Sequence, residues 1–343
     1  MAEGTPGPAG GPAADGAPAP SAPPPGAAPA PAVGAAAPAG ADLLARAQAL
    51  RDELVEQLLA LARVDAPSGG GPAALAAAEA QLADALRALG AEPTRHATDA
   101  GGVLEAHLGP RAGQPVLLLC HYDTVWPAGT AAARPPRVEG DRIHGPGVYD
   151  MRGGIVAALG ALRLLRDADA LARPVRLLLT PDEETGSAAS RPLIERLARG
   201  CAAALVPEPP LPGGVLKTAR KGWATYRLEV TGRSAHAGIE PERGVSAIDE
   251  LVDALRDVRA LADPAQGTTV NVGVVEGGHL PNVVADRAAA TLDVRAWRVA
   301  EQDRVDAALR ALTARREGAT VTARQIHGRP PMERTPQTAA AFA

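Results

Sequence analysis

Near-continuous apolar runs alternate with helix-like segments between residues 41 and 208, and this alternation constrains the fold more than any other feature of the chain. PVLLLC (115–120), PVRLLLT (174–180) and CAAALVP (201–207) have the length and composition of strands buried on both faces. Segments such as GGIVAALGALRLLRD (153–167) instead carry apolar residues at helical spacing. Strands and helices in this order are typical of an α/β domain. We therefore predict a mixed, largely parallel sheet with flanking helices.

The pattern changes after residue 214. WATYRLEVTG (223–232) alternates apolar and polar residues, as a half-exposed antiparallel strand does. A helix, two strands, a second helix and a last strand follow, which gives the β-α-β-β-α-β order of a ferredoxin-like domain. We expect a first part of an α/β domain over 41–214, an inserted α+β domain over 215–327, and the start of a return to the first domain at 328–343. Residues 1–40 are almost all Ala, Pro and Gly, which predicts a disordered tail.

Composition and charge argue against some classes of binding partner. The net charge is −4 and the arginines are scattered, so no basic patch favours nucleic acid. No apolar run approaches the roughly 20 residues of a membrane-spanning helix. The two cysteines, Cys120 and Cys201, form no CxxC motif, which favours a reducing compartment. With no recognisable signal peptide, we expect a cytoplasmic protein that binds neither nucleic acid nor membranes, although the true start of the chain stays open.

Polar residues gather where the predicted strands of the first domain end. Ligands of open α/β sheets bind beyond the carboxyl ends of the strands, so these side chains should converge. One imidazole with several carboxylates suits a divalent cation such as Zn²⁺. Each segment alone could be a capped or solvated loop, but together they predict a metal site. Its candidates are His121, Asp123, Asp150, Glu183, Glu184 and Glu208.

The segments HYDTVWPAGT, GPGVYDMRGG, TPDEETGS and VPEPP resemble the motifs of a di-zinc exopeptidase family. This family includes glutamate carboxypeptidase, acetylornithine deacetylase and succinyl-diaminopimelate desuccinylase. The motif sequences of this chain are most similar to those of the glutamate carboxypeptidase branch. The resemblance implies that Glu183 is the general base and acid, and that Asp123 orients the imidazole of His121. It also implies a ligand set in which His121 and Glu208 bind the first zinc, Glu184 binds the second, and Asp150 bridges the two.

The same resemblance assigns roles in the inserted domain, which would be a lid and the dimerisation surface of a homodimer. His236 in GRSAHAGIEPERG matches a lid histidine that reaches the active site of the partner subunit. Asn282 and Arg295 match a pair that grips the carboxylate of the substrate. From the residues alone, His236 could be a loop histidine and Arg295 a charge on an exposed sheet face.

The resemblance implies zinc-dependent hydrolysis of a C-terminal amide bond in a small peptide or N-acyl amino acid. The alternatives are an N-acyl-amino-acid deacylase of the same fold and a truncated, non-catalytic dimerisation protein. Complete members hold two zinc ions per subunit, and their remaining ligand is a histidine in the last part of the catalytic domain. We expect the second zinc site to be incomplete in this chain. The chain would be a fragment of an enzyme or a genuine short form, and its ending in TAAAFA, within an expected helix, favours a fragment.

Overall fold

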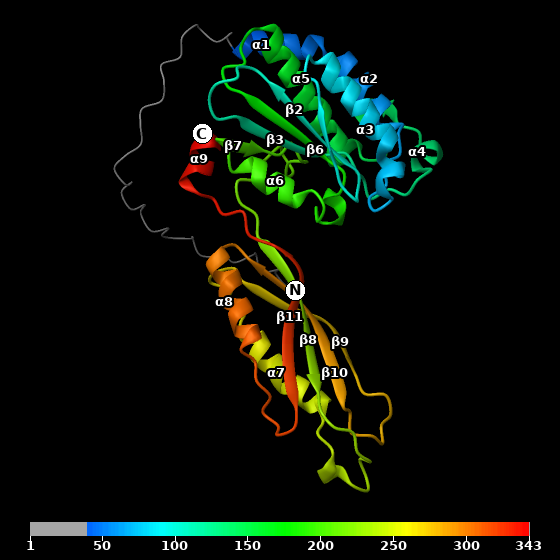
Figure 1. Cartoon of the computed structure of the whole chain (residues 1–343), viewed down its shortest axis with the longest axis vertical. Helices are drawn as coiled ribbons and strands as arrows, with labels where there is room; N and C mark the ends of the chain where they lie inside the picture. Colours follow the sequence, from blue (N-terminus) through cyan, green and yellow to red (C-terminus); the bar gives the residue numbers. More distant parts are fainter. Residues whose placement is uncertain (1–39, 343) are drawn as a thin grey trace, which may run out of the picture.

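The computed structural model describes residues 40–342, which form a larger and a smaller unit (Figure 1). The tail predicted for 1–40 lies outside the described residues, apart from Gly40 at the start of α1. Among the described residues, no helix combines the length and the apolar character that crossing a membrane requires.

The larger unit is built on a five-stranded mixed sheet in the order β1-β2-β6-β3-β7. Its strands are β1 (Thr94–Ala97), β2 (Gly102–Leu108), β3 (Val116–His121), β6 (Val175–Thr180) and β7 (Ala203–Leu205). β3 runs parallel to both β6 and β7, whereas β2 runs antiparallel to β6 and to β1. The carboxyl ends of β3, β6 and β7 therefore meet at one edge of the sheet, which is where the sequence places the candidate ligands.

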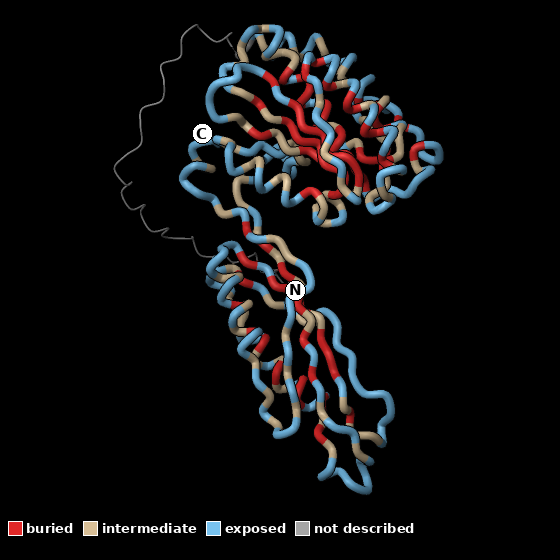
Figure 2. Tube along the Cα trace, viewed as in Figure 1, coloured by how far each residue is buried: buried red, intermediate tan, exposed pale blue. Residues whose placement is uncertain are grey.

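Helices cover both faces of this sheet. On one face lie α2 (Arg51–Ala62), α3 (Gly71–Ala88) and α5 (Gly153–Asp167), and α1 (Gly40–Ala49) packs against α2 and α5. The stripe of Leu75, Leu82 and Leu86 on α3 is fully buried against β2, as expected for apolar residues at helical spacing. The other face packs against α6 (Arg191–Ala198) through Val103, Leu117 and Leu178. Figure 2 shows the resulting buried centre of the larger unit.

Short elements connect these layers. They are α4 (Thr130–Ala133), the hairpin β4 (Arg137–Glu139) and β5 (Arg142–His144), and the helical turns Val148–Arg152 and Glu183–Thr185. Residues 42–64 carry apolar side chains at helical spacing throughout, but the structure divides them into two helices, α1 and α2, which meet in a turn at Leu50. The last described element is α9 (Pro336–Phe342).

The smaller unit is an antiparallel four-stranded sheet in the order β11-β8-β10-β9, covered on one face by α7 and α8. The serine at position 246 caps α7 by accepting a hydrogen bond from Asp249 N at 3.2 Å. The order β-α-β-β-α-β is the one predicted from the sequence. The elements are β8 (Gly222–Thr231), the turn Pro241–Arg243, α7 (Ala247–Arg259), β9 (Thr269–Gly277), β10 (Arg287–Ala296), α8 (Val299–Arg310) and β11 (Thr320–Arg329).

Two chain segments cross between the units, and they pair with each other. Arg220 N donates to Met332 O at 2.9 Å, and Met332 N donates to Arg220 O at 3.0 Å. The unit that carries the predicted metal site and the unit that carries the predicted lid are thus joined by a paired, two-stranded connection (Figure 1).

Candidate metal centre

His121 is the last residue of β3, and its imidazole is almost completely buried. Its Nδ1 lies 3.0 Å from the carbonyl oxygen of Asp123 and 3.2 Å from Asp123 Oδ1. Its Nε2 lies 3.1 Å from Asp150 Oδ1 and 3.3 Å from Glu208 Oε1. One ring nitrogen is therefore held by an orienting group, while the other faces two carboxylates that could share a cation with it.

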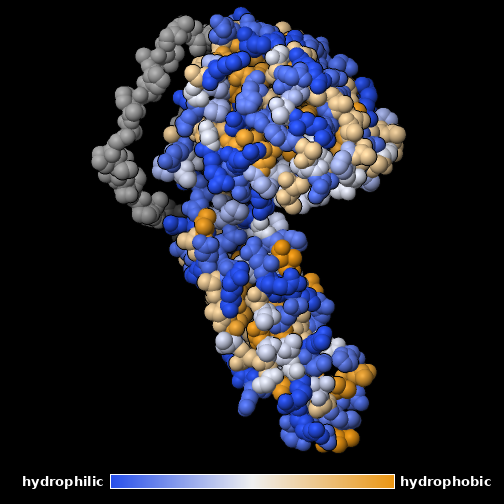
Figure 3. Space-filling model, in the orientation of Figure 1, coloured by the Kyte–Doolittle hydropathy of each residue, from blue (hydrophilic) through white to orange (hydrophobic). Residues whose placement is uncertain are grey.

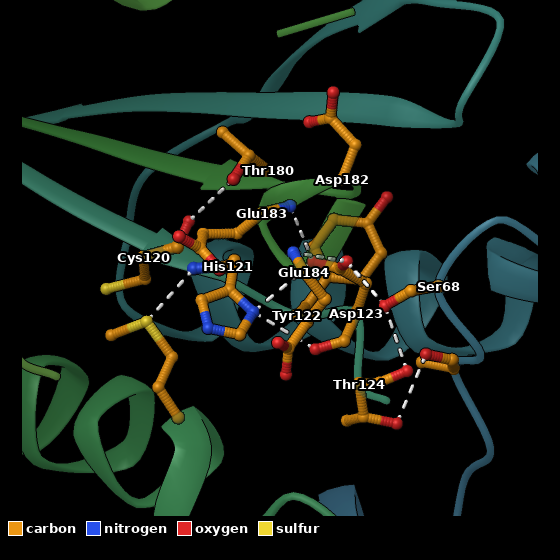
Figure 4. Close-up of polar contacts among 12 residues, drawn as sticks. Ser68, Cys120, His121, Tyr122, Asp123, Thr124, Thr180, Asp182, Glu183 and Glu184 are labelled. Carbon is orange, nitrogen blue, oxygen red and sulfur yellow. Dashed lines mark hydrogen bonds and ion pairs between the residues drawn. The ribbon is translucent and has the colours of Figure 1, made fainter. Parts of the chain in front are cut away.

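Asp123 has no solvent exposure and joins the loops of the site (Figure 4). Besides His121, its carboxylate accepts hydrogen bonds from Ser68 Oγ at 2.8 Å and from the backbone N–H groups of Glu183 and Glu184, both at 3.2 Å. Fixing His121 is thus only part of what this carboxylate does. It also fixes the turn that presents the two glutamates.

A glycine allows Glu208 to approach Asp150. Asp150 lies in the turn Val148–Arg152, immediately before α5. A Cβ at Gly154, in the first turn of α5, would lie 1.8 Å from the carbonyl oxygen of Pro207. The loop that carries Glu208 therefore crosses the start of α5 in direct backbone contact, which any larger residue at position 154 would prevent.

The two glutamates follow β6 in a single turn, Glu183–Thr185. The buried carboxylate of Asp182 holds this loop by accepting hydrogen bonds from Ala189 N at 2.9 Å and Ser190 N at 3.1 Å. Glu183 Oε1 receives a hydrogen bond from Arg329 Nη1 at 2.7 Å, so the end of β11 reaches the site. Burial, together with the charge of Asp150, raises the pKa of Glu184.

The electrostatics of the site favour a positive charge between its carboxylates. Burial alone lowers the pKa of His121, but hydrogen bonds and charges from Asp123 and Glu208 outweigh burial and raise the pKa to about 11. The neighbouring carboxylates thus favour a second proton on the imidazole in the metal-free chain. A bound cation would take the place of this proton.

Two groups of ligand atoms lie close enough to hold a metal ion, and both contain His121. One combines it with Asp150 and Glu184, and the other with Glu183 and Glu208, with all ligand atoms of a group within 4.8 Å of one another. One imidazole nitrogen with carboxylate oxygens is a donor set that suits Zn²⁺ and similar divalent cations. The residues present therefore fit a metal centre.

The candidates in the smaller unit do not join this cluster within one chain. His236 and Asn282 lie together, with Ala237 N donating to Asn282 O at 2.9 Å. The loop between β8 and α7, which holds His236, is at the end of the unit away from the larger one (Figure 1). Arg295 lies opposite Trp223 near the start of β8 and pairs with Asp293 at 2.9 Å. These three substrate-binding roles stay predictions.

Two residues outside the predicted set, Ser68 and Arg329, contact the site. Ser68 was part of PSGGGP, which marks only a helix break. Arg329 is the last residue of β11, at the junction of the units. A serine before a run of glycines and an arginine at a domain boundary carry no signal of such contacts, because their partners are distant in the chain.

Comparison with known proteins agrees with the two-unit architecture. The family model described as peptidase dimerisation domain matches residues 218–321, and that described as peptidase family M28 matches residues 104–205. Carboxypeptidase G2 from a Pseudomonas strain is 32% identical over 276 residues, which cover 78% of this chain and 66% of that protein. The chain thus spans slightly less than two thirds of the length of this relative.

Solved structures share the fold. Aminopeptidase PepT from Bacillus cereus superposes with a TM-score of 0.69 at 22% identity, over 82% of this chain and 77% of that one. An M20 family metallo-carboxypeptidase from Sulfolobus solfataricus superposes with a TM-score of 0.56 at 20% identity, over 80% of this chain and 79% of that one. At these identities the likeness concerns the fold alone.

Proposed function

Because the match to the peptidase dimerisation domain and the likeness to carboxypeptidase G2 place this chain in the M20 peptidase family, we propose that it takes part in metal-dependent hydrolysis of a C-terminal amide bond. The substrate would be a small peptide or an N-acyl amino acid with a free carboxylate. The observation that carries this proposal is the buried imidazole of His121, which is held by Asp123 on one side and faces the carboxylates of Asp150 and Glu208 on the other.

Zn²⁺ is the cation that we propose. His121, Asp150 and Glu208 would hold a first ion, and Asp150 and Glu184 would contribute to a second, incomplete site. When bound, such a cation polarises a carbonyl group and acidifies a water molecule. The protein would supply the orientation of these ligands through Asp123, whose buried carboxylate connects the ends of β3 and β6.

Glu183 is the general base and acid in this proposal. Its carboxylate lies in one cluster with His121 and Glu208, and it would accept a proton from water and return it to the leaving amine. Arg329 holds the same carboxylate at 2.7 Å in this conformation. Glu183 must therefore loosen this ion pair when it takes up the proton.

The smaller unit would bring two chains together. It matches a peptidase dimerisation domain, and its edge strand β9 leaves Val274 and Val275 more than half exposed. Figure 3 shows that hydrophobic residues also reach the surface at the end of this unit that lies away from the larger unit. We propose a homodimer in which His236 approaches the metal centre of the partner, while Asn282 and Arg295 bind the substrate carboxylate.

The test combines hydrolysis with metal content. The full chain loaded with Zn²⁺ is assayed on peptides and N-acyl amino acids that have a free C-terminal carboxylate. Glu183→Ala should lower kcat at least 100-fold at unchanged zinc content, since removal of a general base costs about 10²–10⁴ in rate. Glu195→Ala, which changes an exposed side chain of helix α6, is the matched control and should keep full activity.

Two results would count against the proposal. Near-normal turnover by Glu183→Ala would remove this residue from the reaction. A zinc-loaded wild-type chain that hydrolyses none of these substrates would instead favour the non-catalytic dimerisation protein. Preference for one acyl group over all peptides would point to the deacylase.

A further inference from the structure

We propose that Ser68 is a positioning residue of the metal centre, acting on His121 and on both glutamates through Asp123. This inference rests on the proposed function, because it gives Ser68 a role only where His121 and its carboxylates hold a cation. Ser68 lies in the loop between α2 and α3, in the helical layer that covers one face of the sheet.

The backbone of this loop is fixed to the end of β3. Ser68 N donates to Thr124 O at 2.8 Å, and Thr124 N donates to Ala66 O at 2.8 Å, so that Pro67 and Thr124 form a parallel bridge. The loop thus continues the pairing of the sheet beyond β3. Its position is set by backbone hydrogen bonds that do not involve the serine side chain.

The glycines that follow Ser68 allow the tight turn of this loop. Gly69 has φ +72, a left-handed conformation that glycine adopts at low cost. A Cβ at Gly70 would lie 2.8 Å from Ala74 Cβ and 3.1 Å from Pro67 O, so the chain must turn here without a side chain. This turn places the serine between the helical layer and the metal site.

The hydroxyl of Ser68 has two acceptors within reach. Asp123 Oδ2 lies at 2.8 Å, and the carbonyl oxygen of Thr124 lies at 2.9 Å. A hydroxyl has one proton, and a carboxylate accepts a stronger hydrogen bond than a neutral carbonyl group does. The proton therefore points to Asp123, whose carboxylate is fully buried.

Ser68 differs from the other groups that hold this carboxylate. The remaining donors are the N–H groups of Glu183 and Glu184 and the imidazole of His121, all of which belong to the site itself. Among the described residues, Ser68 is the donor that ties Asp123 to the helical layer. Without it, the carboxylate could rotate together with the groups that it is meant to orient.

Removing the Ser68 hydroxyl should therefore have a measurable effect on Zn²⁺ affinity and on kcat. Loss of an outer hydrogen bond to a metal-binding group typically costs about 10–100-fold in metal affinity or activity. Ser68→Ala should therefore weaken Zn²⁺ binding by about 10–100-fold and lower kcat by a similar factor. KM should stay unchanged, because Ser68 contacts none of the residues assigned to the substrate.

The experiment measures the Zn²⁺ affinity of the full chain by competition with a chromophoric chelator, alongside kcat, KM and thermal unfolding of the metal-free protein. Ser68→Thr keeps the hydroxyl and should restore the affinity to within a few-fold of wild type. Ser246→Ala is the matched control, because it removes a serine hydroxyl that caps α7 in the smaller unit. It should lower the unfolding temperature and leave Zn²⁺ affinity unchanged.

Each outcome separates this inference from the proposed function. Wild-type affinity in Ser68→Ala would overturn the role of Ser68 while leaving the metal centre in place. So would an equal loss in Ser68→Ala and Ser68→Thr when both fold as wild type does. A wild-type chain that binds no Zn²⁺ would instead reject the proposed function, and the role of Ser68 with it.

Discussion

Replacing Asp123 with asparagine would remove the charge of the buried carboxylate and turn one of its oxygens into an amide donor. Oδ1 now faces Glu183 N and His121 Nδ1, while Oδ2 faces Ser68 Oγ and Glu184 N. The NH2 group of the asparagine should take the place of Oδ2. Ser68 tolerates this exchange, because its hydroxyl can donate instead to the Thr124 carbonyl oxygen at 2.9 Å. Only Glu184 N then loses its acceptor.

The loss of stability and the loss of Zn²⁺ affinity can both be estimated from these hydrogen bonds. A buried donor without an acceptor costs about 1–3 kcal/mol, and Asp123→Asn should destabilise the metal-free chain by this amount. Because the amide also holds the imidazole more weakly than a carboxylate does, Zn²⁺ affinity should fall by about 10–100-fold. Urea unfolding of the metal-free protein measures the first effect, and chelator competition measures the second.

Asp263→Asn is the control for this experiment, since Asp263 also accepts hydrogen bonds from two backbone N–H groups but lies in the smaller unit. It should leave Zn²⁺ affinity unchanged. Wild-type stability and affinity in Asp123→Asn would refute the reasoning, because they would show that the carboxylate neither holds the turn nor orients the imidazole.

The other predictions concern parts of the chain outside the metal centre. Burial raises the pKa of Glu105, but hydrogen bonds from His96 and His107 and the charge of Arg176 outweigh it, so the pKa lies below its usual value. The stability that this carboxylate contributes is present above about pH 4.5 and is lost as the pH falls through its lowered pKa. Glu105→Gln should therefore be less stable than wild type at pH 7, with the two unfolding free energies converging towards pH 3; a constant difference would contradict this. Val275→Asp should convert the proposed dimer to monomers in analytical ultracentrifugation, and an intact dimer would exclude β9 from the interface.

The fold and the ligand candidates could be predicted because both depend on local patterns. Apolar runs that end in charged residues predict strands, and the parallel pairing of β3 with β6 and β7 then brings His121, Glu183 and Glu208 to one edge. The order of the smaller unit follows from its alternating strands. These signals lie within segments of ten or so residues, where periodicity and composition are informative.

The contacts of Ser68 and Arg329 could not be predicted, because they join residues that are distant in the chain. Ser68 is 55 residues from Asp123, and Arg329 is 146 residues from Glu183. Periodicity does not reveal such pairs, which depend on how the loop after α2 and the end of β11 pack in three dimensions.

The most direct test of the metal centre is a zinc titration of the wild-type chain and of His121→Ala, with His107→Ala as the control. His107 is an exposed histidine on β2, outside both groups of candidate ligands. Since both groups contain His121, its loss should abolish tight Zn²⁺ binding, whereas His107→Ala should bind as wild type does. Tight binding that persists in His121→Ala would contradict a metal centre built on this imidazole.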